Sequence, residues 1–353
     1  MGNWIKVNIK DILKILYGKD YKDQGAGNIP VYGTGGIMCY INNYLCNWNC
    51  VCIGRKGTIN KPIYIDQPFW CVDTLFYSKA KNYNSPKFQY YLFQTINWDK
   101  LNEASGVPSL SSSTIEKIKI FIPNTDEQKR IADFLSLIDQ RIDTQSKIIE
   151  DLELFKKGIE NQYFSCNKNN EYVILGDVIT QINNRNEKNI DFEVLSVSNK
   201  YGFIPQSEQF DDHEVASANK SNYKIVKQND FAYNPARINV GSIAMLRNNQ
   251  VGIVSPMYIC FRANNNRILS SYLDYFSHSN KFNNEVLKNL EGSVRLCLSF
   301  ESLSKIKIHL PSLDTQYEIV KNLDLISNKI SIENKILEKL KEQKKYLLSN
   351  MFI

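Results

Sequence analysis

The chain has 353 residues and a formal net charge of +6, with 43% hydrophobic and 23% charged residues. This length suggests two or three domains, and the composition is that of a folded globular protein rather than a disordered chain. No run of about 18 apolar residues is present, and the N-terminal residues form neither a signal peptide nor a myristoylation site. We therefore expect a cytoplasmic protein that does not enter a membrane.

The first part of the chain predicts short β-strands between glycine turns, followed by a helix. The expected elements are strands at 49–53, 62–65 and 69–77, an aromatic-rich helix at 86–101, a Gly/Ser loop at 105–111 and a strand at 117–122. The second part predicts the same order of element types. Its elements are strands near 192–197, 242–247 and 251–261, a helix over about 269–290, a loop at 291–295 and a strand at 305–310.

Two basic stretches with glycine lie between predicted strands, at 54–61 and 234–242. Glycine allows close backbone approach, lysine and arginine reach phosphates, and arginine and asparagine suit readout of guanine and adenine. We therefore identify Arg55, Lys56, Thr58, Lys61, Arg237, Asn239 and Ser242 as candidate DNA-binding residues. The alternative is that both stretches are exposed turns with solvated charges.

Two further loops, at 33–36 and 198–202, supply the candidates Thr34, Lys200 and Tyr201. Plain turns are the alternative there as well. The positive charge lies mainly in the first part of the chain, since residues 1–125 carry 14 basic and 8 acidic side chains. Residues 165–313 carry 16 basic and 14 acidic side chains. This balance fits contact with a polyanion.

The chain contains an internal repeat, which is its strongest sequence signal. The stretch Lys117–Pro123 recurs as Lys305–Pro311, and identical residues continue at the same shift through to Phe164 and Phe352. The protein is therefore predicted to be a duplicated unit, in which a variable domain is followed by a short strand and a long helix.

Each repeated helical segment has apolar residues at alternating spacings of four and three, which is the coiled-coil period. The positions predicted to pack are Ile131, Leu135, Ile138, Ile142, Ile149, Leu152, Ile319, Leu323, Ile326, Ile330, Leu337 and Leu340. Both stripes are interrupted at equivalent places, by Gln145 and Glu333 and by Lys156 and Lys344. We expect a capping box at 125–128 and an N-cap at Asp314.

The repeat predicts an α/β (α+β) fold of two globular domains joined by two long antiparallel coiled-coil helices with pseudo-twofold symmetry. The predicted boundaries are 1–125 and 165–313 for the domains, and 126–164 and 314–353 for the helices. About 33 helical residues at ~1.5 Å each would make a rod of roughly 50 Å.

Catalytic and metal-binding signals are missing from the sequence. Cys46, Cys50 and Cys52 are close together, but their spacing matches no common zinc site and no histidine is near them, so we expect reduced cysteines and no metal. The sequence has no P-loop and no convincing nuclease or Ser/His/Asp pattern. The Asn234–Pro235 pair lacks the rest of the adenine-methyltransferase motif. We expect a non-catalytic chain.

The stretches 122–131 and 135–139, together with 53–58 and 105–111, resemble the DNA-specificity subunit of type I restriction–modification systems. The resemblance extends over essentially the whole chain. The second half departs from the pattern, with Thr315 and Tyr317–Glu318 in the helix start and with 295–297 in place of Val-Pro-Ser.

The resemblance implies two target-recognition domains that each read half of a bipartite site in double-stranded DNA, separated by a helical spacer. It also implies two methyltransferase subunits and additional restriction/translocase subunits as partners. The S-adenosylmethionine, ATP and Mg would then be bound by those partners, and this chain would hold no cofactor.

Three alternatives stay open at this point. The chain could be a stand-alone or phage-derived DNA-binding decoy of the same fold. It could be a module detached from a single-chain restriction–methylation enzyme. It could also be a coiled-coil scaffold that binds only proteins, and salt-sensitive DNA binding would separate that reading from the others.

Overall fold

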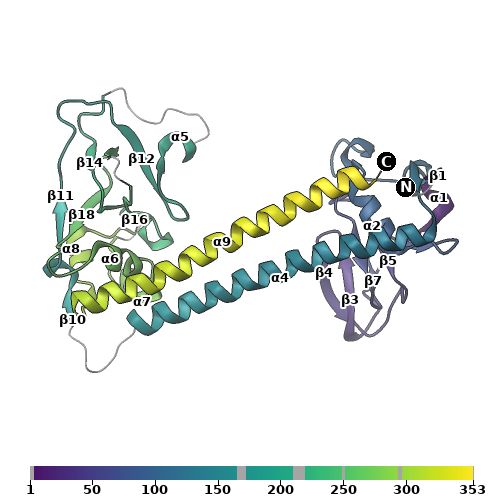
Figure 1. Cartoon of the computed structure of the whole chain (residues 1–353), viewed down its shortest axis with the longest axis horizontal. Coiled ribbons are helices and arrows are strands. Elements are labelled where there is room, and N and C mark those ends of the chain that lie inside the picture. Colours follow the sequence, from purple (N-terminus) through teal and green to yellow (C-terminus); the bar gives the residue numbers. More distant parts are fainter. Residues whose placement is uncertain (1–3, 165–171, 210–218, 249–250, 293–295, 353) are drawn as a thin grey trace. The chain divides into compact units, whose positions relative to one another are not determined.

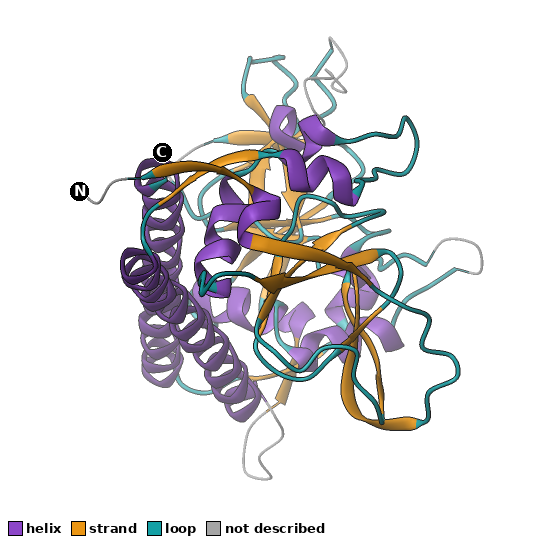
Figure 2. Cartoon of the chain, turned by 90° about the vertical axis from the view of Figure 1, so that its right-hand side faces the viewer, coloured by secondary structure: helices purple, strands orange, loops and turns teal. Residues whose placement is uncertain are grey.

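The computed structural model describes residues 4–164, 172–209, 219–248, 251–292 and 296–352 (Figure 1). The chain divides into two compact units. The first unit comprises residues 1–147 and 334–353, and the second comprises 148–333. Each unit therefore contains part of both long helices, α4 (Thr125–Phe164) and α9 (Leu313–Met351), which are uninterrupted (Figure 2).

The described residues of the first unit form three small sheets. The strand pair is β1 (Ile5–Asn8) with β9 (Lys119–Ile122); the four-stranded sheet is β2 (Leu13–Tyr17), β8 (Leu75–Ala80), β5 (Cys50–Gly54) and β6 (Ile63–Ile65); the third is β4 (Gly36–Ile41), β3 (Ala26–Gly33) and β7 (Trp70–Cys71). The short helices are α1 (Ile9–Ile12), α2 (Pro86–Thr95), η1 (Trp98–Leu101) and α3 (Ser112–Lys117).

The described residues of the second unit also form three sheets. The strand pair is β10 (Tyr172–Ile174) with β19 (Lys307–His309); the next sheet is β11 (Ile179–Ile182), β18 (Ile259–Ala263), β15 (Asp230–Tyr233) and β16 (Ile243–Met245); the third is β13 (Gly202–Pro205), β12 (Glu193–Ser198), β17 (Gly252–Val254) and β14 (Lys224–Val226). The helices are η2 (Leu175–Asp177), α5 (Gln206–Gln209), η3 (Ile238–Val240), α6 (Ser270–Ser277), α7 (Asn280–Lys288) and α8 (Phe300–Ser304).

The sheet topology of the two units is the same apart from β14. In the order of hydrogen-bonded neighbours across each sheet, β2-β8-β5-β6 corresponds to β11-β18-β15-β16, and β1-β9 corresponds to β10-β19. The parallel pairing of β3 with β7 recurs as the parallel pairing of β12 with β17. The duplication predicted from the sequence is therefore confirmed at the level of strand order, including in regions where the residues have diverged.

Each unit has a core that includes side chains from both long helices. In the first unit, Leu135 of α4 belongs to a buried cluster against which Leu347 and Met351 of α9 pack. In the second unit, Phe164 of α4 is buried in one cluster with Leu323 of α9. Within each unit the end of one helix lies beside the start of the other, so the two helices are antiparallel there, as predicted (Figure 1).

All twelve predicted packing positions of the long helices lie in the described part of the chain and are buried or half-buried. Ile131, Leu135, Ile138, Ile149, Ile319, Leu323 and Leu340 are buried, and Ile142, Leu152, Ile326, Ile330 and Leu337 are half-buried. Among the described residues, no helix has the length and apolar character needed to cross a bilayer.

The predicted starts of the long helices are wrong by one or two residues. Asn124 caps α4, since its Oδ1 accepts from the Glu127 amide at 2.9 Å. Ser312 rather than Asp314 caps α9, because its Oγ accepts from the Thr315 amide at 3.3 Å. Short polar side chains directly before a helix satisfy its free amides. The residue expected to close the capping box, Gln128, is used differently.

Several predicted elements are divided in the structure. The helix expected at 86–101 consists of α2 and η1, and the one expected at 269–290 consists of α6 and α7. The second helix is divided because Ser279 starts α7, with its hydroxyl accepting from the Phe282 amide. The strands expected at 69–77 and 251–261 are likewise two strands each, separated by turns.

Candidate nucleic-acid interface

The first basic loop connects β5 to β6, as the sequence predicts. β5 is fully buried, and a Cβ on Gly54 at its end would lie 2.1 Å from the Thr58 carbonyl oxygen, so the turn requires glycine. The Arg55 amide donates to the Thr74 carbonyl at 2.8 Å. Its guanidinium Nη1 donates to the Asp73 carbonyl at 3.3 Å and lies 5.5 Å from the ring centre of Tyr17. The structure thus holds Arg55 on a defined surface.

The Gly/Ser loop at 105–111 packs against this basic loop. The Gly57 amide donates to the Pro108 carbonyl at 2.8 Å, and the Leu110 amide donates to the Arg55 carbonyl at 2.9 Å. Lys56 forms an isolated bridge with Ser109. Two segments that lie far apart in the sequence, and that both carry the family resemblance, are therefore brought together. Lys56 and Lys61 are exposed, and Thr58 is half-buried.

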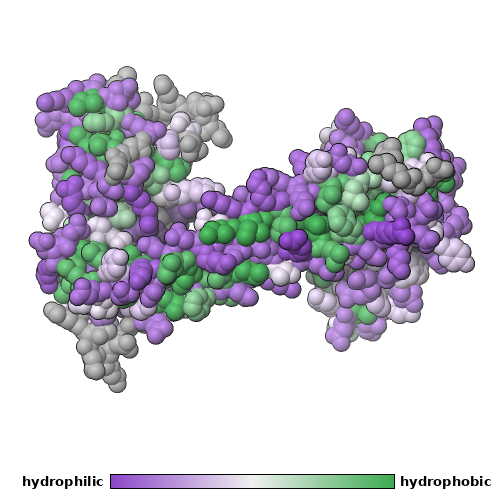
Figure 3. All heavy atoms as spheres, viewed as in Figure 1, coloured by the Kyte–Doolittle hydropathy of each residue, from purple (hydrophilic) through white to green (hydrophobic). Residues whose placement is uncertain are grey.

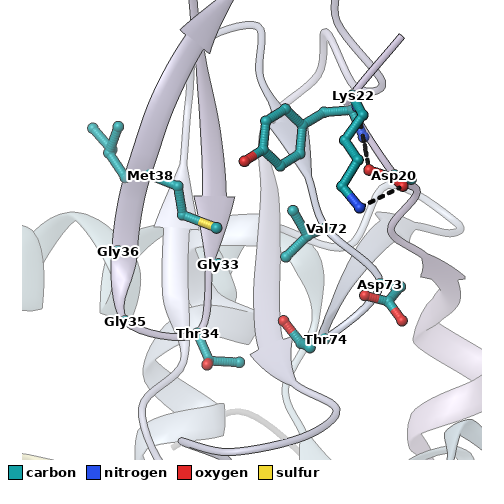
Figure 4. A pocket seen from close by; sticks show the side chains of 12 residues that line it. Asp20, Lys22, Gly33, Thr34, Gly35, Gly36, Met38, Val72, Asp73 and Thr74 are labelled. Carbon is teal, nitrogen blue, oxygen red and sulfur yellow. Dashed lines mark hydrogen bonds and ion pairs between the residues drawn. The ribbon is translucent and has the colours of Figure 1, made fainter. Parts of the chain in front are cut away.

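A third segment completes this face of the first unit. The turn of the β3–β4 hairpin carries Thr34, and its Oγ1 is 3.3 Å from the position that a Cβ on Gly57 would occupy. Beside the turn lies a hollow of about 880 Å³, shown in Figure 4. Met38 and Val72 give it an apolar wall, and the hydroxyls of Thr34 and Thr74 lie at its lower rim in this view.

Glu103 holds the Gly/Ser loop in place, a role that the sequence analysis missed. Its Oε1 accepts from the Ser111 hydroxyl at 2.9 Å and also accepts from the Thr114 hydroxyl. These hydrogen bonds, with Thr114 as the larger contributor, lower the pKa of the Glu103 carboxyl. In the second unit, Glu291 accepts from the hydroxyls of Ser299 and Ser302 in the same way. The sequence signal was available, since Glu103 and Glu291 follow the shift of the repeat.

The second basic loop, 234–242, connects β15 to β16 and therefore lies where the first lies between β5 and β6. Arg237 and Asn239 are exposed. Ser242 is only 4% exposed, and its hydroxyl donates to the Val197 carbonyl at 3.1 Å. A buried side chain with this bond does not fit a contact with DNA. We therefore correct the prediction for Ser242, which instead ties the loop to β12.

The hairpin β12–β13 corresponds to β3–β4 and presents Lys200 and Tyr201 to solvent. Ser198 Oγ accepts from the amides of Lys200 and Tyr201 at 3.2 and 3.3 Å, which fixes the turn. The Lys200 Nζ lies 4.9 Å from the Tyr201 ring centre. A Cβ on Gly241 would lie 3.6 Å from the Asn199 Cβ, so this turn adjoins the basic loop of its unit as the first hairpin does.

Glycines with positive φ mark the equivalence of these loops. Gly36 and Gly202 stand in the closing pair of each hairpin, with φ of 115° and 69°. Gly57 and Gly241 turn the two basic loops, with φ of 94° and 86°. Residues with a Cβ adopt this conformation only with strain. Both units therefore build the same two-loop backbone. Of the loop predicted at 291–295, residues 293–295 lie outside the described residues.

Four cysteines of the first unit, Cys46, Cys50, Cys52 and Cys71, are buried together in one apolar cluster. The Sγ atoms of Cys46 and Cys50 are 4.0 Å apart, and those of Cys50 and Cys52 are 3.9 Å apart. They share an apolar cluster with Cys71 and Phe69. Burial raises the pKa of the Cys52 thiol. Within the described ranges, no group of three or more His, Cys, Asp or Glu side chains could hold a metal ion.

Two buried glutamines join the long helices to the starts of α2 and α6. Gln128 Nε2 donates to Asn84 Oδ1 at 2.8 Å and to the Pro123 carbonyl at 3.0 Å, and its Oε1 accepts from the Ser85 amide. In the second unit, Gln316 Nε2 donates to two backbone carbonyls and its Oε1 accepts from the Leu269 amide at 2.9 Å. Each glutamine therefore ties the start of a long helix to the start of α2 or α6.

Comparison with known proteins agrees with this architecture. A family model described as the type I restriction modification DNA specificity domain matches residues 1–154 and 167–342. The type I restriction enzyme MjaVIII specificity subunit of Methanocaldococcus jannaschii is 26% identical over 402 residues, which cover 98% of this chain and 91% of that protein.

Solved structures show the same fold at low sequence identity. The type I restriction–modification S subunit from M. genitalium has a TM-score of 0.66 at 17% identity, covering 100% of this chain and 96% of that chain. A structure described in terms of complex assembly and conformational transition of the type I R-M system has a TM-score of 0.60 at 14% identity, covering 99% and 97%.

The protein is thus a duplicated mixed helix-and-sheet protein of the DNA-specificity class. Because the family model matches most of its length, the chain belongs to the type I restriction modification DNA specificity family. Its function is that of a type I restriction–modification specificity subunit, and the resemblance stated from the sequence is confirmed.

Proposed function

We propose that this subunit reads a bipartite site in double-stranded DNA, with one half-site for each unit. The observation that carries the proposal is a repeated loop framework that presents different side chains in its two copies. Residues 1–125 and 165–313 are the two target recognition domains. Residues 126–164 and 314–353 are the spacer helices that set the unread gap.

Within each unit, we assign exposed and half-buried loop residues to contacts with DNA. Arg55 in the first unit and Arg237 with Asn239 in the second have the hydrogen-bonding groups that suit base edges in the major groove. Lys56, Lys61 and Lys200 suit phosphates, which position the protein without carrying sequence information. Thr34, Thr58 and Tyr201 line the same loops.

We also propose that two copies of a methylation subunit bind the long helices at equivalent surfaces. Hydrophobic side chains gather along the surface of these helices (Figure 3). Leu137 on α4 and Leu325 on α9 occupy the same position of the repeat and are 57% and 62% exposed. Ile148 and Ile336 are a second exposed pair of this kind. Identical apolar residues left exposed in both copies fit two identical partners.

The chemistry of the complex is assigned to the partners. We propose that this chain carries no catalytic step and no cofactor. S-adenosylmethionine would be bound by the two methyltransferase subunits, and ATP and Mg by the restriction/translocase subunits. A chain that recognises DNA for such partners would work in the cytoplasm.

The main test is to map adenine methylation directed by the chain when it is co-purified with its methylation partner. We expect one split site with a fixed gap. Exchange of residues 1–125 for the first target recognition domain of another family member should change one half-site and leave the gap unchanged. Methylation at a contiguous site, or a gap that changes when this domain is exchanged, would contradict the proposal.

The spacer is tested by inserting four residues after Gln145, which lengthens α4 by ~6 Å. Since B-DNA rises ~3.4 Å per base pair, the unread gap should grow by one or two base pairs. Both half-site sequences should stay the same. An insertion that altered a half-site sequence instead would show that the helices do not set the distance.

The docking surfaces are tested with the matched variants Leu137→Asp and Leu325→Asp. Each should remove one of two bound methylation subunits, measured by the mass of the purified complex. Leu154→Asp is the control, because Leu154 is exposed at 65% but Glu342 takes its place in the other copy. Loss of a subunit in the control, or of none in the matched variants, would reject these surfaces.

A further inference from the structure

Two lysines interrupt the apolar stripes of the long helices at equivalent positions of the repeat. Lys156 lies on α4 and Lys344 on α9, and both are half-buried. A lysine among apolar packing positions costs stability, because its charge loses water. Lysine occupies this position in both copies of the repeat, and the contacts of each lysine indicate what it does there.

In the first unit, Lys344 joins three helices. Its Nζ lies 2.7 Å from Asp139 Oδ1 on α4 and 5.8 Å from the ring centre of Tyr91 on α2. The Tyr91 hydroxyl donates to the other oxygen of Asp139, Oδ2, at 2.9 Å. One carboxylate therefore accepts from the helix of the recognition domain and from the opposite long helix. We call Lys344, Asp139 and Tyr91 the first junction.

In the second unit, an equivalent junction forms with the long helices exchanged. Lys156 Nζ of α4 lies 5.3 Å from the ring centre of Tyr275 on α6. The Tyr275 hydroxyl donates to Asp324 Oδ1 on α9 at 2.6 Å. Lys156 pairs with Glu160 on its own helix at 3.8 Å. Lys156, Tyr275 and Asp324 form the second junction.

The acidic partners of the two tyrosines are not copies of each other. In the repeat, Asp139 corresponds to Ser327, and Asp324 corresponds to Ser136. Both units nevertheless have a hydrogen bond from the tyrosine hydroxyl to a carboxylate on a long helix. That carboxylate lies about one helical turn away from the position it has in the other unit. Simple inheritance from the duplication would have kept the same position. A contact that persists while its residues change place points to a requirement for the contact itself.

We infer that Lys344, Asp139 and Tyr91, with their counterparts Lys156, Asp324 and Tyr275, are positioning residues for the reading of the gap between half-sites. This inference rests on the proposed bipartite function. The chain passes between the units twice, at 147–148 within α4 and at 333–334 within α9, so both long helices are shared by the two units. Each junction fixes where a recognition helix sits on that helix pair.

A lysine suits this task better than a leucine would. An apolar stripe tolerates sliding by one heptad, because each apolar residue then meets another apolar residue. Sliding by one heptad would place Lys344 against Ala132 or Ser146 instead of Asp139. The charged group therefore finds its partner in one register, as a single polar residue does in coiled coils.

The test compares the methylation of DNA substrates whose half-sites are unchanged and whose gap is varied by one base pair at a time. The variant Lys344→Met, in complex with the methylation partner, keeps an unbranched side chain without the charge. We expect discrimination against gaps that differ by one base pair to fall about three- to tenfold, with unchanged half-site sequences. The thermal stability of the variant should fall, because the Asp139 carboxylate loses its cation. A loss of stability alone would lower methylation at all gaps alike, so the change in gap profile is the readout that a merely structural role would not move.

Two further variants make the outcome decisive. Lys339→Met is the matched control, since Lys339 is 78% exposed on the same helix and pairs with Glu342 of its own helix. The exchange Asp139→Lys with Lys344→Asp should restore gap discrimination at least in part. An unchanged gap profile in Lys344→Met, or an equal change in Lys339→Met, would overturn the inference.

Failure of the proposed function is distinguishable from failure of this inference. If the unmodified complex methylates no split site, the bipartite proposal fails. The junction is then tested in the isolated chain by hydrogen exchange over residues 340–352. Faster exchange there in Lys344→Met than in Lys339→Met would support the positioning role, and equal rates would reject it.

Discussion

The first and second units keep one backbone plan and differ in the side chains that their loops present. Gly36 and Gly57 in the first unit have counterparts in Gly202 and Gly241, all with positive φ angles. The turn of the first hairpin carries Thr34 and Gly35 beside an open hollow, whereas the second presents a lysine stacked on a tyrosine. The backbone positions the loops, and under the proposed function the side chains would supply the base-specific contacts.

The residues that are identical in the two units do a different job from the residues that have diverged. Gln128 and Gln316 form three hydrogen bonds each, and Glu103 and Glu291 each hold a serine-capped helix start. These identical residues hold the frame. The hairpin turns and basic loops present different side chains in the two units, and under the proposed function a substitution there would change a contact with DNA without loss of the frame.

The largest expected effect comes from removing the glutamine of one unit. Gln128→Met and Gln316→Met each leave a buried amide and backbone carbonyls without partners, which should cost about 3 kcal/mol in the free energy of unfolding of the affected unit. Hydrogen exchange resolved by unit, together with calorimetry, measures the effect. Gln140→Met on the exposed face of α4 is the control. A small loss of stability, confined to one unit, would show that the two glutamines do not stabilise their units equally.

The next effect concerns the diverged loops. Arg55→Ala and Arg237→Ala should each weaken specific DNA binding by ~1–3 kcal/mol and relax one half-site only. Lys56→Ala should weaken binding to all sequences alike and reduce its salt dependence. Binding titrations against substrates mutated in one half-site measure both. If none of the three variants changes affinity or specificity, these residues belong to solvated turns. The difference between the loops of the two units would then have no role in DNA recognition.

A smaller effect tests the backbone of the two basic loops. Gly57→Ala and Gly241→Ala both force a Cβ into a positive φ, at about 1 kcal/mol each. The Gly57 variant should lose more stability, because its Cβ would approach Thr34 Oγ1 at 3.3 Å, whereas that of Gly241 meets the Asn199 Cβ at 3.6 Å. Thermal unfolding measures the difference. Gly106→Ala is a control with open space around it.

The duplication and the seven-residue period allowed most of the architecture to be predicted from the sequence. A repeat reports that two segments fold alike, and the heptads report which face of each helix is buried. The residues at which the long helices begin were harder to predict. Asn124 and Ser312 cap the helices, although Thr125 and Asp314 fit the capping pattern equally well on sequence alone.

The candidate site was predictable in its loops but not in the depth of each side chain. Arg55, Lys56 and Arg237 follow from residue type and glycine context. Ser242 could not be told from an exposed serine, because its burial depends on the approach of β12, which lies far away in the sequence. Glu103 was missed because a single glutamate in a loop has no local pattern. Its hydroxyl partners follow eight and eleven residues later.

The smallest effect is a pH dependence of the first recognition loop. Hydrogen bonds from Thr114 and Ser111 lower the pKa of Glu103 below the ordinary value of 4.5. The folded state therefore binds the proton less readily than the unfolded chain does. The stabilisation is complete above pH 4.5 and is lost as the pH falls through the lower folded-state value.

Glu103→Gln should remove this part of the acid sensitivity, because an amide oxygen still accepts hydrogen bonds but carries no charge. Thermal unfolding from pH 3 to pH 7 should show the wild type and the variant converging as the pH falls below 4.5. Glu116→Gln, at a half-buried position of α3, is the comparison for a general change in net charge. A constant difference between wild type and Glu103→Gln over the whole range would mean that the carboxylate charge does not hold the loop. The side chain at position 103 would then hold the loop through packing and neutral hydrogen bonds alone.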